Sequence, residues 1–247
     1  MIIDAHAHLW RTEAEEDKRK ILQAAEHFGI SKVIVSTLDS CIPDQEEIIE
    51  NNQLTWSFIK EEPDLVRGYC YLNPSNAGTM TELRRCVEDR GFCGVKFWIS
   101  TFCDDPAVNP IVEQCIRYRI PILVHAFHKS VNQLPFESLG QNVRNLAERY
   151  PEARLLMAHL GGNCLRELRY IKKCANVWVD FSGSVNHSDD LAYAEKIVGS
   201  NRLIFGSDMP GADFMISYAQ VLESDFAAEE REKFLYQNAE QLFRGRL

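Results

Sequence analysis

The chain has 247 residues, of which 45% are hydrophobic, and it carries 27 Lys and Arg against 36 Asp and Glu, a formal net charge of −9. This length allows a sizeable core, and about 250 residues is the usual size of a parallel barrel domain. The acidic balance, with no basic stripe, excludes nucleic acid and anionic membranes as favoured partners.

The amino terminus, MIIDAHAHLW, lacks the charged and apolar stretches of a secretory signal. No run reaches the ~18 apolar residues of a membrane span. We therefore expect a cytoplasmic protein. Its eight cysteines are spread singly, without a C-x-x-C pair, which predicts reduced thiols rather than disulfides.

Strand-like runs alternate with helix-like runs along the whole chain. The runs of strand type are mostly continuously apolar and β-branched, as is typical of parallel strands buried on both faces. We expect strands at residues 2–5, 32–36, 66–71, 94–98, 120–124, 154–158, 177–180 and 202–205.

The amphipathic stretches between these runs predict helices. Thr12 and Glu15 match a capping box before the first helix, which should end near Gly29. Later helices are expected at residues 43–62, 79–90, 106–118, 137–150, 163–173, 189–198, 210–222 and 227–243.

Eight such strand–helix units indicate a (β/α)8 TIM barrel that forms a single domain over residues 1–247. A doubly wound open sheet is the main alternative. It is disfavoured because no glycine-rich phosphate loop follows the first strand.

Histidine and aspartate residues lie at several predicted strand ends. They are His6 and His8 after the first strand, His125 after the fifth, His159 after the sixth and Asp208 after the eighth. The carboxyl ends of barrel strands meet around one mouth, so these scattered residues are predicted to form one site. Residues i and i+2 of a strand point the same way, which makes His6 and His8 a chelating pair suited to zinc.

The histidine pair alone is a weak motif, because two strand-end histidines can simply bond to loops. His125 and His159 can likewise be ordinary buried histidines that bond to the backbone. The prediction of a metal site therefore depends on the combination of all these strand ends.

The chain resembles the metal-dependent amidohydrolase superfamily, and within it the amidohydrolase-related branch that includes aminocarboxymuconate semialdehyde decarboxylase. The resemblance covers essentially the whole chain. It rests on the segments DAHAHLW, GFCGVKFW, DDPAVNPIVEQCIRYRIPILVHAF, MAHLGG, NVWVDFSG, LIFGSDMP and NAEQLF, in this order.

The resemblance implies roles for the strand-end residues. His6, His8, His125 and Asp208 would hold one divalent metal, zinc or alternatively manganese. His159 would act as an acid or base beside the water that the metal activates, and Asp208 would share this proton transfer.

Lys96 ends the fourth predicted strand, where some amidohydrolases carry a carboxylated lysine that bridges two metals. A lysine that pairs with an acid or contacts substrate is the other interpretation. We expect one metal and an unmodified Lys96, because the branch that the chain resembles mostly uses a single metal.

Other residues follow strand ends at the predicted mouth and are candidates for substrate contact. They are Trp10, Trp98, His128 and His187. Aromatic side chains at a barrel mouth can stack on a flat substrate. Each of these residues singly also fits a packing role.

We expect a metal-dependent hydrolase of a small carbonyl compound such as a lactone, ester or amide, with homo-oligomerisation left open. The alternative is a metal-dependent non-oxidative decarboxylase of an aromatic or unsaturated acid, for which Arg11 and Lys129 are available as cations for the leaving carboxylate. A third class is a barrel that binds a ligand without catalysis, which the complete ligand set disfavours.

Overall fold

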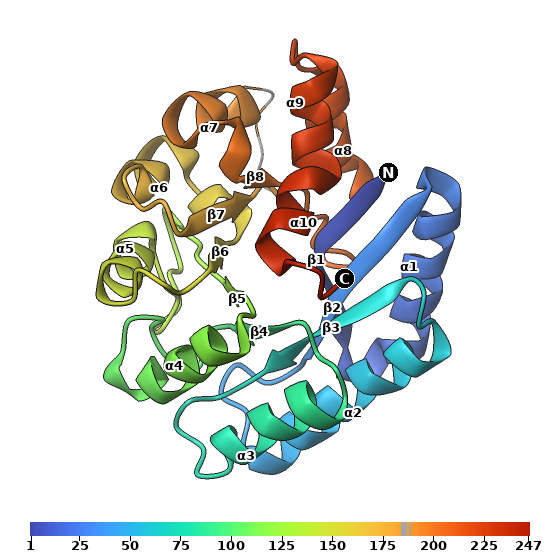
Figure 1. The fold of residues 1–247 in the computed structure, drawn as a ribbon, viewed down its shortest axis with the longest axis vertical. Coiled ribbons are helices and arrows are strands. Elements are labelled where there is room, and N and C mark those ends of the chain that lie inside the picture. The colour runs from blue at the N-terminus through green and yellow to red at the C-terminus, as the bar shows by residue number, and fades with distance from the viewer. Residues whose placement is uncertain (184–186, 188) are drawn as a thin grey trace.

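The computed structural model describes residues 1–183, 187 and 189–247, which form a (β/α)8 barrel (Figure 1). Its eight parallel strands follow one another in chain order around the sheet. They are β1 (Ile2–Trp10), β2 (Ile30–Leu38), β3 (Val66–Tyr71), β4 (Gly94–Phe97), β5 (Ile122–Val124), β6 (Leu155–Met157), β7 (Val177–Asp180) and β8 (Leu203–Ile204). The predicted barrel is confirmed.

Backbone hydrogen bonds close the sheet between its first and last strands. The Ala5 amide donates to the Phe205 carbonyl at 3.0 Å, and the His8 amide donates to the Met209 carbonyl at 2.7 Å. The Asp208 amide donates to the His6 carbonyl, also at 2.7 Å. The segment that follows β8 therefore lies against the carboxyl half of β1.

Helices surround the sheet on its outer face (Figure 1). They are α1 (Ala14–Phe28), α2 (Gln45–Glu61), α3 (Thr79–Arg84), α4 (Asn109–Tyr118), α5 (Gly140–Arg149), α6 (Cys164–Ile171), α7 (Asp190–Val198), α8 (Phe214–Glu223), α9 (Ala228–Glu232) and α10 (Asn238–Phe243). A π-helical turn over Arg85–Asp89 continues α3, and another over Lys233–Gln237 joins α9 to α10.

The predicted capping box at Thr12 and Glu15 is wrong. A 3-10 turn over Arg11–Glu13 leads into α1, and Glu13 precedes that helix without a side-chain cap. The helix does end at Gly29, which has the left-handed φ of 67° that glycine adopts without steric cost. A capping box occurs instead at α2, where the side chain of Asp44 accepts from the first-turn amides.

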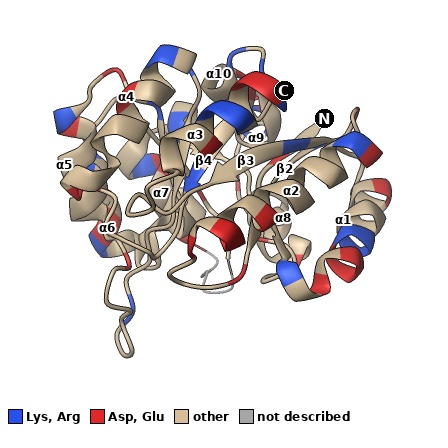
Figure 2. Cartoon of the chain, turned by 90° about the horizontal axis from the view of Figure 1, so that it is seen from below, with Lys and Arg blue, Asp and Glu red and all other residues tan. Residues whose placement is uncertain are grey.

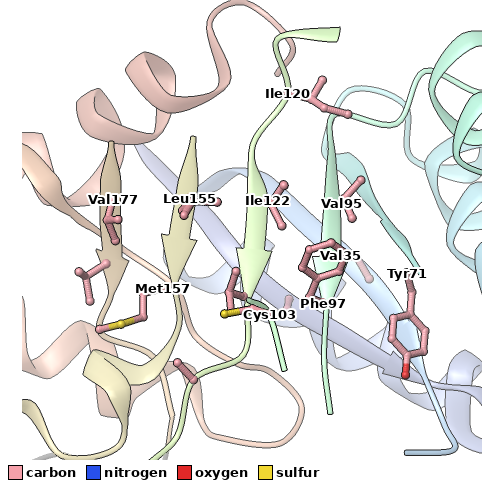
Figure 3. Close-up of a cluster of buried hydrophobic side chains, with 14 of the residues drawn as sticks. Val35, Tyr71, Val95, Phe97, Cys103, Ile120, Ile122, Leu155, Met157 and Val177 are labelled. Atoms are coloured by element: carbon pink, nitrogen blue, oxygen red, sulfur yellow. The ribbon is translucent and has the colours of Figure 1, made fainter. Parts of the chain in front are cut away.

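The strand residues pack in two directions, which separates the outer core from the barrel interior. Val95, Ile122, Leu155 and Val177 are paired across β4 to β7 and belong to the cluster shared with the helices (Figure 3). The next residue of each strand points the opposite way. Leu123 is one of these residues. It belongs to a second cluster, inside the barrel, whose members come largely from the strands.

Most charged residues lie on the outer helices and loops, with both signs mixed along elements such as α1 (Figure 2). This distribution agrees with the absence of a basic stripe in the sequence. Among the residues described, no helix combines the length and apolar character needed to cross a bilayer.

The interior cluster yields a test of stability. Leu123 has no exposed surface, so Leu123→Ala should leave a cavity and lower the free energy of unfolding by about 2–5 kcal/mol. Leu165 is 57% exposed, and Leu165→Ala should change it by less than about 0.5 kcal/mol. Urea titrations followed by circular dichroism measure both. Equal losses would contradict the interior packing.

Candidate metal centre

Three of the predicted ligands meet directly at the mouth of the barrel. β1 is longer than expected and carries both histidines within the strand, where their Nε2 atoms lie 2.9 Å apart. Oδ1 of Asp208 lies 3.2 Å from Nε2 of His8 and 3.6 Å from Nε2 of His6. The hydrogen bonds that close the sheet therefore bring residues 200 positions apart into one cluster.

Two further histidines extend this cluster. His125 follows β5, and its Nδ1 lies 3.2 Å from Nε2 of His159. The rings of His6 and His159 have centroids 4.9 Å apart. His125 is thus placed beside His159 rather than directly against the β1 pair.

The backbone is strained at two of these positions. His159 has a φ of 61° and Asp208 a φ of 64°, both in the left-handed region. Non-glycine residues held there cost on the order of 1–3 kcal/mol and cluster at functional sites. The surrounding hydrogen bonds hold both side chains toward the centre despite this cost.

Acceptors behind the β1 histidines fix the direction of their rings. Nδ1 of His6 lies 3.0 Å from Oδ2 of Asp180, a buried carboxylate at the end of β7. Nδ1 of His8 lies 2.9 Å from the hydroxyl and 3.3 Å from the carbonyl oxygen of Ser36. Each Nδ1–H then points outward, and the Nε2 lone pair faces the centre.

Ser182 does the same for His159. The Ser182 hydroxyl donates to Oδ1 of Asp180 at 2.6 Å, so its oxygen accepts from Nδ1 of His159 at 3.0 Å. His6, His159 and Asp180 also form a geometric group of potential metal ligands. The Ser182 hydroxyl already contacts all three residues, and we therefore interpret this second group as support for the histidines.

His125 is oriented by a different acceptor. Its Nε2 lies 2.9 Å from Oε1 of Glu137, so the neutral ring carries its hydrogen on Nε2 and turns the Nδ1 lone pair toward His159.

The resulting donor set fits a divalent cation. Imidazole lone pairs face one another at 2.9 Å and 3.2 Å, with a carboxylate oxygen beside them. Such contacts are repulsive unless a proton or a cation lies among them. Nitrogen donors with one carboxylate suit zinc or manganese.

Burial keeps the imidazoles neutral. It lowers the pKa of His8 and His125 and holds that of His6 well below its usual value, while the pKa of His159 falls to about 4. Burial alone would raise the pKa of Asp208, but the neighbouring histidines, His159 first, hold it well below the usual range. An ionised carboxylate among neutral imidazoles is the state that binds a metal.

Lys96 lies fully buried on β4, and its Nζ is 3.0 Å from Nε2 of His6. Its row across the sheet contains Leu123, which places it in the barrel interior. Burial lowers the pKa of Lys96 to about 8. The Lys96 amine therefore lies within hydrogen-bond distance of the nitrogen that His6 presents to the centre.

An aromatic wall adjoins the cluster. The ring centroids of Trp10 and Trp98 lie 6.0 Å apart, and Trp98 also contacts Tyr71 at 6.3 Å. Trp10 in turn lies 6.3 Å from the ring of His8. Both tryptophans are partly exposed, and aromatic faces of this kind can stack on a flat molecule.

The remaining mouth residues lie on the side of His159 rather than beside the β1 histidines. His128 and His187 line a cavity of about 430 Å³ that also reaches His159. Nε2 of His128 accepts from the Arg166 guanidinium at 2.7 Å.

The two cations considered for a carboxylate clamp already have partners. The Arg11 guanidinium pairs with Asp39 and Glu50, and the Lys129 amine lies 2.8 Å from Oε1 of Glu137.

Sequence reasoning missed the residues that orient the histidines, namely Ser36, Glu137, Asp180 and Ser182. Asp180 ends a predicted strand in the same way as the candidate ligands, so the strand-end pattern could have identified it. Glu137 was expected inside a helix, and no sequence signal marks its contact with His125.

A model of the amidohydrolase family matches residues 3–245. The chain belongs to the amidohydrolase family. The resemblance drawn from the sequence motifs is therefore confirmed at the level of the family. The members of this family are enzymes.

Individual relatives of this amidohydrolase are distant. A 2-keto-4-carboxy-3-hexenedioate hydratase from Sphingobium sp. is 23% identical over 225 residues, which cover 76% of this chain and 62% of the hydratase. The chain therefore aligns with less than two thirds of that relative.

Two solved structures are similar over nearly their full length. A 2,6-dihydroxybenzoate decarboxylase from Rhizobium has a TM-score of 0.79 at 18% identity, with 98% of each chain covered. A dihydroxybenzoic acid decarboxylase from Polaromonas sp. JS666, with bound manganese and 2-nitroresorcinol, has a TM-score of 0.78 at 17% identity and covers 98% of this chain and 96% of its own. At these identities the likeness shows a shared fold.

The hydrogen bonds of Asp180 in this amidohydrolase give a second test. Its carboxylate accepts from His6, from the His159 amide and from Ser182. Asp180→Asn replaces one acceptor by a donor and should lower the free energy of unfolding by about 1–3 kcal/mol for each buried partner left unpaired. Asp225→Asn, at an exposed carboxylate, is the control for urea titration. Matching midpoints would contradict the network.

Proposed function

We propose that the chain is a metal-dependent lyase that removes carbon dioxide from a small, flat aromatic or unsaturated carboxylic acid. The observation that carries this proposal is that the candidate metal ligands adjoin an aromatic surface. The ring of Trp10 contacts that of His8. The two decarboxylases with a similar fold support it. Hydrolysis of a lactone, ester or amide remains a prediction that no relative named above supports.

In this proposal His6, His8, His125 and Asp208 hold one divalent metal. The sequence predicted zinc, with manganese as the alternative. The manganese bound in the Polaromonas structure supports manganese. When bound, such a metal supplies a Lewis acid that fixes the anionic substrate and draws electron density from the carbon that loses carbon dioxide. We propose that Lys96 stays unmodified and that its amine, 3.0 Å from Nε2 of His6, gives up the lone pair of that nitrogen to the metal.

His159 is the proposed proton donor. Decarboxylation breaks the bond between the ring or alkene carbon and the carboxylate, and that carbon needs a proton in exchange. Nε2 of His159 faces the cluster, while its Nδ1 is held by Ser182 at 3.0 Å. In the neutral ring Nε2 carries a lone pair, so it would first take up a proton from a substrate hydroxyl group or from water. The ring would then deliver that proton to the carbon without rotating, as a positioned acid–base catalyst does.

The aromatic wall has the role of orienting the substrate. Trp10 and Trp98 meet at a steep angle of 61° and present partly exposed rings. A planar acid that packs against them brings its carboxylate toward His8. Stacking of this kind contributes about 0.5–1.5 kcal/mol beyond the area buried.

Hydration of an unsaturated acid is the second candidate, favoured by the 23% identical hydratase. It would use the same histidine to protonate one alkene carbon while water adds to the other. The two reactions differ in product, since only decarboxylation releases carbon dioxide.

The metal proposal makes a direct prediction. Purified protein should hold about one equivalent of zinc or manganese after dialysis, measured by elemental analysis. His8→Ala should lose it because Nε2 of His8 faces the cluster. His27→Ala, at an exposed histidine on α1, should retain it. Two equivalents would indicate a carboxylated Lys96, and no metal in the wild-type protein would contradict the centre.

The activity is tested with a panel of hydroxybenzoic acids, unsaturated polycarboxylic acids and lactones, supplied to the metal-loaded protein. We expect carbon dioxide release from a planar acid. His159→Asn should keep the metal and lower kcat by roughly 10²–10⁴-fold, the usual contribution of a positioned acid. Loss of an unsaturated acid without carbon dioxide would favour hydration, and turnover of lactones alone would overturn the proposal in favour of hydrolysis.

A further inference from the structure

Glu137 is a buried carboxylate that reaches the centre from the loop between β5 and α5. Only 2% of its surface is exposed. Oε1 lies 2.9 Å from Nε2 of His125 and 2.8 Å from Nζ of Lys129, and Oε2 accepts from the Gln133 side chain at 2.8 Å. The Glu137 carboxylate thus connects three side chains of this loop through hydrogen bonds and ion pairs.

We propose that Glu137 is a positioning residue that fixes the tautomer of His125 and so decides which of its nitrogens faces the metal centre. This inference rests on the proposed metal site. It assigns His125 a different donor atom, Nδ1, from the Nε2 that His6 and His8 present.

The chemistry of the two partners supports the assignment. An ionised carboxylate only accepts hydrogen bonds, so the hydrogen between Glu137 and His125 belongs to Nε2 of the imidazole. The Lys129 ammonium beside the same oxygen favours the ionised carboxylate. Without the Glu137 carboxylate, the neutral His125 ring would exchange between its two tautomers. In a fraction of the protein molecules His125 would then turn an N–H rather than a lone pair toward the centre.

The loop provides a firm base for this contact. The Phe127 amide donates to the Ser138 carbonyl at 3.0 Å, next to a bridge between Ala126 and Ser138. The Ser138 hydroxyl accepts from the Cys103 amide at 2.9 Å, which ties the loop to the segment after β4. Both ends of the Glu137–His125 contact are therefore attached to the barrel close to the ring.

The decisive variant is Glu137→Gln, with Glu82→Gln as the matched control. Glu82 is also buried and hydrogen-bonded, but it pairs with Asn52 and Arg85 away from the centre. Nitrogen-15 NMR of the metal-free proteins reports the tautomer of His125, whose signals are identified by their loss in His125→Ala. Competition with a chromophoric chelator gives the affinity for zinc and for manganese.

We expect the wild-type His125 to carry its hydrogen on Nε2 and Glu137→Gln to show a mixture of tautomers. Metal affinity should fall about 10–100-fold, as for other residues that orient a ligand, and Glu82→Gln should keep the wild-type affinity. Glu137→Asp, which keeps the charge but withdraws it from the ring, should weaken binding in the same direction and serves where the Gln variant does not fold.

An unchanged tautomer together with unchanged affinity in either Glu137 variant would overturn the inference. An Nδ1–H tautomer in the wild-type protein would also overturn it. Failure of the wild-type protein to bind metal is a separate result that removes the proposed function, because the NMR measurement of the tautomer uses no metal.

Discussion

The site depends on the closure of the sheet between β1 and the segment that follows β8. Two of the three hydrogen bonds that close the barrel, from Asp208 to the His6 carbonyl and from His8 to the Met209 carbonyl, also place the Asp208 carboxylate against both imidazoles. The same backbone contacts therefore determine both the closure of the barrel and the geometry of the site. Because the bonds run through the backbone, side-chain changes nearby can alter the chemistry without opening the barrel.

A second layer of side chains converts this proximity into a directed site. Buried imidazoles have two nitrogens, and each ring needs an acceptor behind it to turn one lone pair inward. Asp180 provides this for His6, and Glu137 provides it for His125. Their carboxylates also keep buried N–H groups paired, which avoids a cost of about 1–3 kcal/mol for each unpaired donor.

The sequence predicts the barrel and the residues that meet at its mouth, because both follow from local patterns. Continuous apolar runs mark buried parallel strands, and a residue at a strand end is carried to the mouth wherever it lies in the chain. The length of β1 was underestimated, since His6 and His8 interrupt the apolar run although both continue the strand. The capping box at Thr12 was wrong because a short motif cannot show that a 3-10 turn precedes the helix.

Apart from Asp180, which ends a predicted strand, the orienting residues could not be predicted because their roles come from contacts between distant segments. Glutamate is a residue type that favours helices, yet α5 begins three positions after Glu137, at Gly140. The Glu137 carboxylate instead contacts His125 and Lys129. Left-handed backbone at His159 and Asp208 is similarly invisible in the sequence. These departures from local preference gather around one cluster, as expected where a structure gives up some stability to hold reactive groups in place.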